Sequence, residues 1–588
     1  MIEKMDMRKS NYDKSPAVGI DAPLWKGWDA VRAQVENACR SPRAKDRHIL
    51  VVECYQGVCL EELSAQWALL HPAVYADARS FFKASAEIEV LTRRYLTDDR
   101  LFGYRAPLSY RDFLDAGKIK TFRDQINNLS GLIVLCGPGA AEVLPDADTL
   151  IYADLSRWEI QLRSRRKEIN GLGVENKEEA ASLHYKRGYF IDWNVCDALK
   201  KRLLPKADYW LDTHLPGVPK LISGDTLRAG LEKTVRRPFR VVPFFDPAPW
   251  GGQWMKEICD LDRGQANFGW CFDCVPEENS LYLNVSGEIF EIPANDLVFY
   301  KTRDLLGGPV EVRFGQEFPI RFDFLDTMGG GNLSLQVHPV VQYIRDTFGL
   351  PYTQDESYYV LDAEEGATVY LGIKDEVDPD EMITALYRSQ QTGEPFDAEA
   401  YVNRWPAKKH DHFLIPAGTV HCSGAGAMVL EISSTPSLFT FKLWDWGRLG
   451  LDGRPRPINI GHGSQVIQWE RRTEFVKHQL INQVEQIAEG EGWKEERTGL
   501  HENEFIETRR HWFSHPVFHH TDGSVNVLNV IQGDELIVES PSGAFEPFVV
   551  HYAETFIVPA CVGAYTIRPY GVSAGHSCGT LKAYVRYK

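Results

Sequence analysis

The hydrophobic pattern of this 588-residue chain changes near Pro238, and that change constrains the fold more than any other feature. Before Pro238, continuous apolar runs alternate with segments of helical spacing, as in HILVVECY followed by LEELSAQWALL. Such alternation predicts a parallel sheet covered by helices. After Pro238, short alternating strands separated by Gly, Pro and Asp predict an all-β region. We therefore expect a multidomain protein in which an N-terminal α/β parallel-sheet domain precedes an all-β part.

The all-β part contains two stretches of strand pattern, which predicts two jelly rolls in tandem. The first includes ATVYLGI, HFLIPAGTVHC and AMVLEIS, and the second includes SVNVLNVIQGDELIVE and ETFIVPACVGAYTIRPYG. A short helical insertion runs from TRDLLGG to VRFGQEFP, and EFVKHQLINQVEQIAEGEGWKEE between the two stretches is interpreted as a helix and a polar loop. The expected domains are an α/β domain over 1–235, a metal-binding β domain over 236–475, and a helical segment with a metal-free β domain over 476–588.

The net charge and the composition of the chain limit the binding partners and the cell compartment that we expect. The net charge is −17, from 65 basic and 82 acidic residues, which argues against nucleic acid and anionic membranes as partners. There is no run of about 18 apolar residues and no apolar signal-peptide core at the start. The 11 cysteines lack a disulfide-scaffold spacing, so we expect reduced thiols and a cytoplasmic protein. A homo-oligomer is compatible with these features.

The stretch NLSLQVHP places Gln336 and His338 two residues apart, so on a strand both side chains point the same way. An isolated pair of this kind is usually an exposed edge strand. Further along, Glu356 precedes an alternating strand and His421 follows a Pro-Ala-Gly-Thr turn. One amide, two imidazoles and one carboxylate are a plausible ligand set for a zinc-like divalent ion. The spacing alone leaves both interpretations open.

The motifs PAPWGG, NLSLQVHP, DESYYVLDAEEGATVYLG, HFLIPAGTVH and LEIS occur in that order. Over roughly residues 240–588 they resemble the zinc-dependent type I mannose-6-phosphate isomerases, a cupin-fold family. The resemblance implies a double cupin, with Gln336, His338, Glu356 and His421 holding one zinc or other divalent metal per chain. It also implies isomerisation of mannose 6-phosphate to fructose 6-phosphate, or of a related sugar or sugar phosphate. The alternative is a non-catalytic sugar-binding or regulatory cupin.

Some charged positions depart from this family's pattern. Asp323 and Gln354 stand where lysine is common, and Lys442 stands where the family has an arginine. The family's phosphate-side Ser334 is present, as is Glu431, which the resemblance places in the acid–base machinery together with Lys442. We therefore expect Glu431 and Lys442 to be catalytic, Ser334, Gln354 and Asp323 to contact substrate, and the phosphate grip to be altered. The simpler alternatives are a satisfied buried carboxylate for Glu431 and a surface lysine for Lys442.

The segment HILVVECYQGVCLEEL resembles the start of P-loop kinases in layout. A working P-loop ends in Gly-Lys-Ser/Thr, whereas Val58, Cys59 and Leu60 follow Gly57 here. The helix that carries Arg163, Arg165 and Arg166 resembles a kinase lid, the alternative being an exposed basic helix face. We expect a kinase-like domain without catalysis.

Two further motifs are interpreted as structural. Cys271 and Cys274 form a lone C-x-x-C among strands, so we expect buried small side chains rather than a metal or redox site. His515, His519 and His520 are expected to be surface or packing residues rather than a second metal site.

Overall fold

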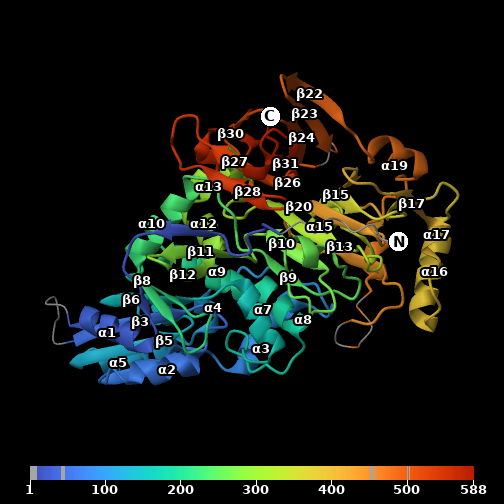
Figure 1. Ribbon diagram of the computed structural model, residues 1–588. Helices are drawn as coiled ribbons and strands as arrows, with labels where there is room; N and C mark the ends of the chain where they lie inside the picture. The colour runs from blue at the N-terminus through green and yellow to red at the C-terminus, as the bar shows by residue number, and fades with distance from the viewer. Residues whose placement is uncertain are drawn as a thin grey trace. The chain divides into compact units, whose positions relative to one another are not determined.

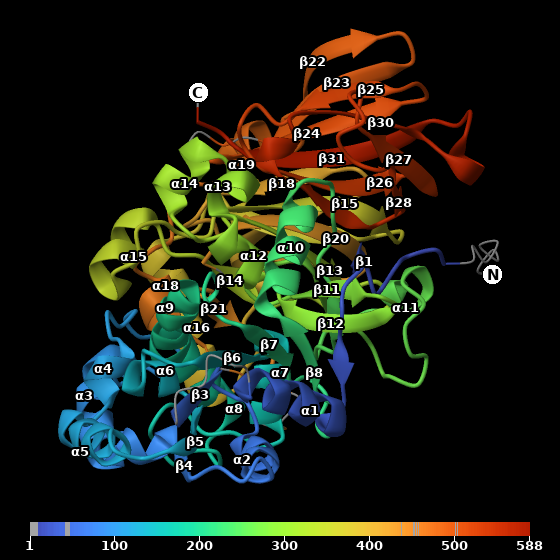
Figure 2. The same ribbon diagram turned by 90° about the vertical axis from the view of Figure 1, so that its left-hand side faces the viewer.

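The computed structural model describes residues 10–40, 47–436, 438–450, 453, 456, 458–499, 501 and 504–587. The chain forms two compact units, which are described separately and can be followed by their labels in Figures 1 and 2. The α/β unit comprises Ala17–Thr234 and Glu277–Lys301. The β unit comprises the described residues up to Pro16, together with Val235–Pro276 and the described residues from Thr302 onward.

The α/β unit is built on one sheet with the strand order β2-β8-β7-β6-β3-β5-β4. The central strand β3 is buried from Leu50 to Cys54, as its continuous apolar run predicts for a strand covered on both faces. It pairs in parallel with β5 and β6, and β4 and β7 continue the parallel pairing on the two sides. The strands are β2 (Trp25–Lys26), β3 (Arg47–Cys54), β4 (Val74–Asp77), β5 (Gly131–Gly137), β6 (Thr149–Asp154), β7 (Tyr209–Asp212) and β8 (Lys220–Ser223).

Helices follow most of these strands, and α1, α2 and α5 lie beside the sheet in both views (Figures 1 and 2). A short π-helix, Gly188–Asp192, joins α8 to α9. The helices are α1 (Trp28–Cys39), α2 (Leu60–Ala68), α3 (Ser85–Leu96), α4 (Tyr110–Phe113), α5 (Ala116–Ile126), α6 (Ala140–Val143), α7 (Arg157–Arg165), α8 (Ala181–Arg187), α9 (Trp193–Leu203), α10 (Gly224–Val235) and α12 (Asn295–Tyr300).

A hairpin from the middle of the sequence also belongs to the α/β unit. Strands β11 (Ser280–Val285) and β12 (Glu288–Pro293) pair with each other, and β1 (Ala17–Ile20) pairs in parallel with β11. The sequence interpretation included these residues in the β domain expected over 236–475, whereas the structure places them in the α/β unit. A local alternating pattern reports that a segment is a strand, but it does not report which sheet receives it.

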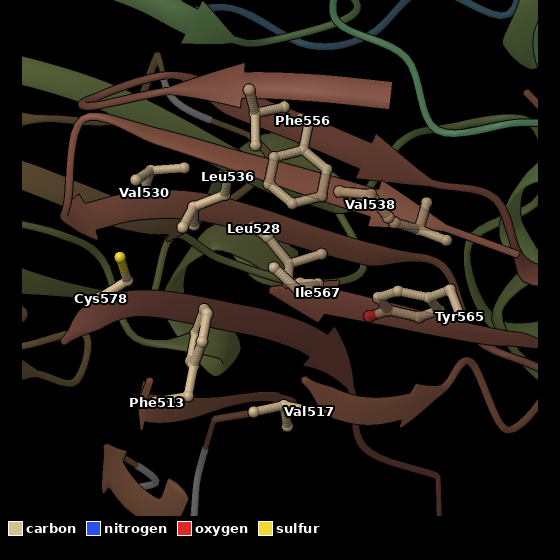
Figure 3. Close-up of a cluster of buried hydrophobic side chains, with 12 residues drawn as sticks. Phe513, Val517, Leu528, Val530, Leu536, Val538, Phe556, Tyr565, Ile567 and Cys578 are labelled. Atoms are coloured by element: carbon tan, nitrogen blue, oxygen red, sulfur yellow. The ribbon is translucent and has the colours of Figure 1, made fainter. Parts of the chain in front are cut away.

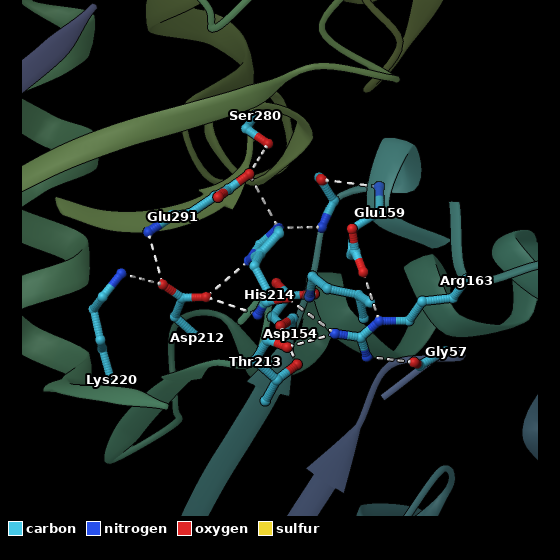
Figure 4. A network of polar contacts seen from close by, with 12 residues as sticks. Gly57, Asp154, Glu159, Arg163, Asp212, Thr213, His214, Lys220, Ser280 and Glu291 are labelled. Carbon is cyan, nitrogen blue, oxygen red and sulfur yellow. Dashed lines mark hydrogen bonds and ion pairs between the residues drawn. The ribbon is translucent and has the colours of Figure 1, made fainter. Parts of the chain in front are cut away.

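A buried polar network holds this hairpin to the parallel sheet (Figure 4). Asp212, at the end of β7, accepts hydrogen bonds from the backbone N–H of Glu291 at 3.1 Å and from His214 Nδ1 at 2.8 Å. His214 Nε2 lies 3.4 Å from Glu291 Oε1. Because an unpaired buried charge is costly, this network favours one position of the hairpin over others.

The β unit contains two sandwiches. In the first, a six-stranded sheet, β18-β15-β20-β13-β10-β9, and a five-stranded sheet, β17-β16-β19-β14-β21, contribute the strands that bear the candidate site. The strands are β9 (Phe244–Asp246), β10 (Trp270–Cys274), β13 (Ile320–Asp326), β14 (Leu335–Val337), β15 (Glu356–Ala363), β16 (Thr368–Ile373), β17 (Val402–Pro406), β18 (His412–Ile415), β19 (His421–Ser423), β20 (Ala427–Ser434) and β21 (Phe441–Trp444). Their pairings are antiparallel, as the short alternating strands predict.

The second sandwich packs an apolar core between a six-stranded sheet, β22-β23-β24-β31-β26-β29, and a four-stranded sheet, β25-β30-β27-β28. Leu528, Val538, Phe556 and Ile567 are fully buried in this core (Figure 3). The strands are β22 (Glu485–Gly490), β23 (Trp493–Gly499), β24 (Ile506–Phe513), β25 (Val517–His520), β26 (Asn526–Gln532), β27 (Glu535–Glu539), β28 (Phe548–His551), β29 (Thr555–Val558), β30 (Ala564–Pro569) and β31 (Cys578–Val585).

Most helices in the β unit are short, apart from the 14-residue α16, and the expected helical insertion is present as α13 and α14. The expected helix and polar loop before the second sandwich are instead α19 followed by the hairpin β22–β23, because charged residues on an edge hairpin conceal its strand pattern. The helices are α11 (Trp254–Ile258), α13 (Thr302–Leu306), α14 (Gly308–Phe314), α15 (Val341–Phe348), α16 (Pro379–Thr392), α17 (Ala398–Tyr401), α18 (Ile460–Gly463) and α19 (Thr473–Gln479). Within the described ranges, no helix combines the length and the hydropathy that a membrane crossing requires.

Candidate functional site

The four residues predicted as metal ligands come together inside the first sandwich. Gln336 on β14 pairs with His421, the first residue of β19, and His338 follows β14 directly. Glu356 begins β15 in the other sheet and reaches both histidines, with Oε1 2.8 Å from His421 Nε2 and Oε2 3.1 Å from His338 Nε2. One ligand atom from each of His338, Glu356 and His421 lies within 4.8 Å of the other two. All four side chains are buried.

The orientation of the two imidazoles suits a metal centre. His338 Nδ1 lies 3.2 Å from the carbonyl oxygen of Phe439, and His421 Nδ1 lies 2.8 Å from that of Thr419. Since a carbonyl can only accept, each Nδ1 carries the proton and each Nε2 presents its lone pair to the centre. Among the described residues, His338 Nε2 and Glu356 Oε1 are buried without a hydrogen bond of good geometry. Buried donor atoms that converge without partners fit a divalent cation.

The amide of Gln336 completes the set after a simple rotation. Gln336 Nε2 lies 3.3 Å from His421 Nε2, and Gln336 Oε1 accepts a hydrogen bond from Ser334 Oγ at 3.2 Å. A half-turn of this amide places its oxygen toward the centre, and the Ser334 hydroxyl can then accept from the amide nitrogen. Ser334 therefore contacts the ligand set directly.

The Pro416–Thr419 turn that presents His421 is fixed from several sides. Gly418 has φ of 93°, and a Cβ there would lie 2.9 Å from the carbonyl oxygen of Val466, so glycine is required on both counts. Its N–H donates to the carbonyl oxygen of His338 at 2.8 Å, which ties the two histidine segments together. Arg471 Nη1 donates to the carbonyl oxygens of Pro416 and Ala417 at 2.6 and 2.7 Å.

A second acidic group lies beside the ligand set. Gln354 Nε2 donates to Glu356 Oε2 at 2.7 Å and lies 3.3 Å from Glu431 Oε1, so this amide bridges the two carboxylates. Burial, together with the charges of Glu356 and Asp323, raises the pKa of Glu431 well above its usual range. The pKa of Glu356 is instead lowered, because His338 and His421 lie against its carboxylate, although burial opposes the shift. Two neighbouring carboxyl groups with divergent pKa values are typical of acid–base sites.

Asp323 on β13 is paired with Glu431 on the neighbouring antiparallel strand β20. Its Oδ2 is 3.2 Å from Arg321 Nη2, and both side chains are buried. Asp323 is therefore part of a buried charge cluster beside Glu431. Arg321 therefore supplies a positive charge next to this buried aspartate.

Lys442 on β21 pairs with Gln336 and is half-buried. Burial, followed by the charge of Arg456 and then that of Arg448, lowers the pKa of Lys442 to about 7, although Asp445 opposes the shift. Asp445 is bound by Arg448 Nη2 at 2.7 Å and Arg456 Nη1 at 2.8 Å. Sequence reasoning missed these two arginines. Their signal was the Gly-, Pro- and Arg-rich loop that directly follows the Lys442 strand, since loops at the ends of strands commonly carry binding residues.

The C-x-x-C motif and the histidines at positions 515–520 lie outside the candidate metal centre. Cys271 and Cys274 are buried on β10, and burial raises the pKa of the Cys271 thiol. His519 is buried and stacks on Tyr565 with ring centroids 5.0 Å apart, whereas His515 and His520 are exposed. The cluster of His338, Glu356 and His421 is thus the site that the described residues offer to a metal ion.

Fold and site together define a protein with two β-sandwiches, a buried His–Glu centre in the first of them, and a separate α/β unit. In sequence, the chain is 28% identical over 222 residues to the mannose-6-phosphate isomerase of Streptococcus mutans, covering 37% of this chain and 64% of that protein. It is 25% identical over 251 residues to the mannose-6-phosphate isomerase ManA of Bacillus subtilis, covering 42% of this chain and 74% of that protein. The chain therefore spans just under two thirds of the length of the S. mutans relative.

Further comparisons match a family model and solved structures. Residues 27–236 match the model of a domain of unknown function, DUF8485. The crystal structure of the mannose 6-phosphate isomerase from Bacillus subtilis matches with a TM-score of 0.48 and 20% identity, covering 59% of this chain and all of that one. A zinc-bound mannose 6-phosphate isomerase structure matches with a TM-score of 0.45 and 14% identity, covering 59% of this chain and 99% of that one.

Proposed function

We propose that this protein is a metal-dependent aldose–ketose isomerase that acts on mannose 6-phosphate or a related sugar. The observation that carries the proposal is the convergence of His338 Nε2, His421 Nε2 and Glu356 on one buried point, beside the second carboxyl group of Glu431. The partial sequence similarity to mannose-6-phosphate isomerases supports the same reaction. The resident cofactor is one zinc or similar divalent ion, held by these three residues and Gln336 in the first of two cupin-type sandwiches.

Isomerisation moves a proton between C1 and C2 of the sugar, so the site must hold and release a proton while negative charge develops on oxygen. A divalent ion, when bound, polarises the sugar oxygens and stabilises that charge. The raised pKa of Glu431 favours the protonated form of its carboxyl group, and Gln354 fixes its position relative to Glu356. Glu431 is therefore the residue we assign to proton movement.

The positions of the other predicted site residues suggest a different role for each. Lys442, with a pKa near neutrality, can place a positive charge or donate a proton to the developing oxyanion. Ser334 and Gln354 orient the Gln336 amide and the two carboxylates, and Asp323 acts on Glu431 through its charge. Arg448 and Arg456 are held by Asp445 and supply cations that can bind a phosphate group. The sequence interpretation had not identified these two cations. A phosphorylated sugar is thus our preferred substrate.

The test is the formation of fructose 6-phosphate from mannose 6-phosphate, measured with a coupled assay before and after removal of metal by a chelator. We expect activity that disappears with the chelator and returns with Zn²⁺. A His338→Ala/His421→Ala double variant should be inactive, whereas His478→Ala, at an exposed position, should behave like the native protein. Binding of mannose 6-phosphate without turnover in the metal-loaded native protein would instead support the regulatory sugar-binding alternative.

For the α/β unit we propose a kinase-like ancestry without phosphotransfer. Arg163 Nη1 donates to the carbonyl oxygen of Gly57 at 2.8 Å, so this loop is bound by a buried arginine of the protein (Figure 4). Neither lysine nor hydroxyl follows Gly57 to contact phosphate or magnesium. The full chain should show no ATP hydrolysis and no phosphate transfer to sugars. Turnover of ATP that a Gly57→Ala change abolishes would contradict this proposal.

Cytoplasmic location, a homo-oligomer, and the absence of nucleic acid and membrane partners stay predictions from the sequence.

A further inference from the structure

The α/β unit contains a cavity of about 200 Å³ that the proposed isomerase reaction does not use. Its lining comes from the loop after β3, from α7, and from the α8–π-helix–α9 segment. In the sheet, β3 lies between β5 and β6, and the chain leaves β3 toward β4 and β5 on one side and later adds β6 and β7 on the other. Gln56 follows β3 and α7 follows β6, so the cavity lies beyond the carboxyl ends of the strands where the order reverses. In open α/β sheets this position is the usual place for a ligand.

Two polar atoms in this cavity lack partners. Asp192 is 1% exposed and Ser164 is 6% exposed. Among the residues that the structure describes, Asp192 Oδ1 and Ser164 Oγ make no hydrogen bond. An unsatisfied buried carboxylate oxygen is costly, so its persistence in a cavity indicates that a ligand or ordered water satisfies it. Asp192 also ends a π-helix, a local geometry that is frequent at functional sites.

Several other polar groups at the cavity wall already have hydrogen-bond partners. Gln56 Nε2 donates to the carbonyl oxygen of Asn170 at 2.9 Å. Glu278 accepts hydrogen bonds from Gln161 Nε2 at 2.7 Å and from Tyr185 Oη at 3.0 Å. These contacts hold the walls in place without a ligand, so the cavity is preorganised, and Asp192 Oδ1 and Ser164 Oγ are its buried atoms without a hydrogen bond among the described residues.

Charge narrows the class of ligand. Asp192 Oδ2 is already 3.2 Å from Arg187 Nε, so the carboxylate is partly neutralised, and burial raises the pKa of Asp192 even though Arg187 opposes the shift. A cation would face Arg187 and the lining residue Arg165, and an anion would face the free oxygen Oδ1 of Asp192. An uncharged donor such as a hydroxyl group can bond Oδ1 without either conflict.

The size and lining of the cavity restrict the class of ligand further. The cavity is smaller than the ~300–1,000 Å³ typical of sites for drug-sized ligands, so it suits a compact molecule. Tyr185 and Trp193 meet edge to face with centroids 5.2 Å apart, and Ile160 and Ile169 add apolar surface. Apolar and aromatic walls with a few convergent polar groups match a ligand that has both C–H and O–H faces.

We propose that the α/β unit binds an uncharged polyhydroxylated ligand of monosaccharide size in this cavity, with Asp192 Oδ1 and Ser164 Oγ as its hydrogen-bonding anchors. This site is separate from the candidate metal centre and does not depend on the isomerase activity. It gives the domain of unknown function a binding role.

The test uses the full chain with the His338→Ala/His421→Ala changes, so that sugar bound at the metal centre does not contribute. Calorimetry and ligand-observed NMR are run with D-mannose, D-glucose, adenosine and inorganic phosphate as separate probes. We expect at least one of the two sugars to bind and adenosine and phosphate not to bind. Absence of binding by both sugars, or preferential binding of adenosine or phosphate, would overturn the proposal.

Variants locate the binding. Asp192→Asn and Ser164→Ala should each weaken sugar binding, on the order of tenfold for Asp192→Asn, because a charge-assisted hydrogen bond is lost. Ile160→Trp should abolish binding by filling the cavity without removing a polar group. Asp225→Asn, on the exposed surface of α10, is the matched control and should bind like the parent. Far-ultraviolet circular dichroism checks each fold, and Ser164→Ala and Ile160→Trp carry the test if Asp192→Asn unfolds. Unchanged affinity in these folded variants would place the sugar elsewhere and contradict the assignment.

Discussion

Glu431 lies directly opposite Asp323 in the antiparallel pairing of β20 with β13, so two buried acidic residues occupy neighbouring positions in the sheet beside the candidate metal centre. The charge of Asp323 raises the pKa of Glu431, and that of Arg321 lowers it. The proton-transfer properties of Glu431 are therefore set by a balance between these two neighbours.

We predict opposite pH shifts when the two neighbours are changed. Asp323→Asn removes the negative charge and should lower the pKa of Glu431, so the limb of the kcat/KM profile that Glu431 controls should move to lower pH. Arg321→Gln removes the positive charge and should move the same limb to higher pH. Profiles of kcat/KM against pH check both signs. Shifts of equal sign in the two variants would show that another group controls the limb.

Metal content should depend on the two histidines together. We expect about one zinc or equivalent divalent ion per native chain and a large loss in His338→Ala/His421→Ala, because both Nε2 lone pairs are removed. Elemental analysis of dialysed protein measures this. His478→Ala should retain the metal, since this exposed histidine lies on α19. Equal metal content in the double variant and the native protein would exclude the proposed ligands.

Lys442→Ala should lower kcat more than it raises KM, because the negative charge that Lys442 faces develops during the reaction. Lys442→Arg keeps a positive charge but replaces a group with a pKa near 7 by one that stays protonated. We expect that variant to retain more activity than Lys442→Ala and to lose the pH dependence near neutrality. Steady-state kinetics from pH 6 to 9 separate these effects. A change in KM alone would assign Lys442 to substrate binding.

Discrimination between mannose 6-phosphate and mannose should depend on Arg448 and Arg456. Arg456→Ala should reduce kcat/KM for the phosphorylated sugar on the order of tenfold and that for mannose much less, since a charge-assisted contact is worth about 1.5–3 kcal/mol. Arg404→Ala is the control, because this arginine is exposed and pairs with Glu399. Equal losses for both sugars would indicate that the arginines only maintain the loop.

The β unit should depend on a buried ion cluster around Arg240. Its Nη1 lies 2.8 Å from Glu554 Oε1 and its Nη2 lies 3.5 Å from Asp273 Oδ1, with all three side chains buried. Arg240→Met should lower the free energy of unfolding by about 3–5 kcal/mol, because two buried carboxylates lose their cation. Urea denaturation followed by circular dichroism measures this.

The same cluster predicts a pH dependence of stability. The pKa of Glu554 is lowered in the folded protein by Arg240 and His551, although burial opposes the shift. Its stabilising contribution is therefore present above the unfolded-state pKa of about 4.3 and is lost as the pH falls through the folded value. Glu554→Gln should flatten this part of the acid unfolding curve. An unchanged slope would mean that other carboxylates dominate acid unfolding.

The sequence determined the local parts of this protein. Continuous apolar runs gave β3, β5 and β6, and alternating patterns gave strands such as β15 and β20, because burial on one or both faces imposes a period that can be read directly. The Gln336–His338 pair and the Pro-Ala-Gly-Thr turn before His421 were also visible, since strand alternation and turn chemistry act over a few residues.

The tertiary structure decided which of these parts meet. Pairing of β14 with β19 places Gln336 opposite His421, and pairing of β13 with β20 places Asp323 opposite Glu431, although nothing local to these segments specifies those registers. The β11–β12 hairpin likewise belongs to the α/β unit through contacts distant in sequence, such as its parallel pairing with β1. The physical reason is that register and sheet membership minimise the free energy of the whole packed unit, in which buried charges must find partners, and no segment carries that information alone.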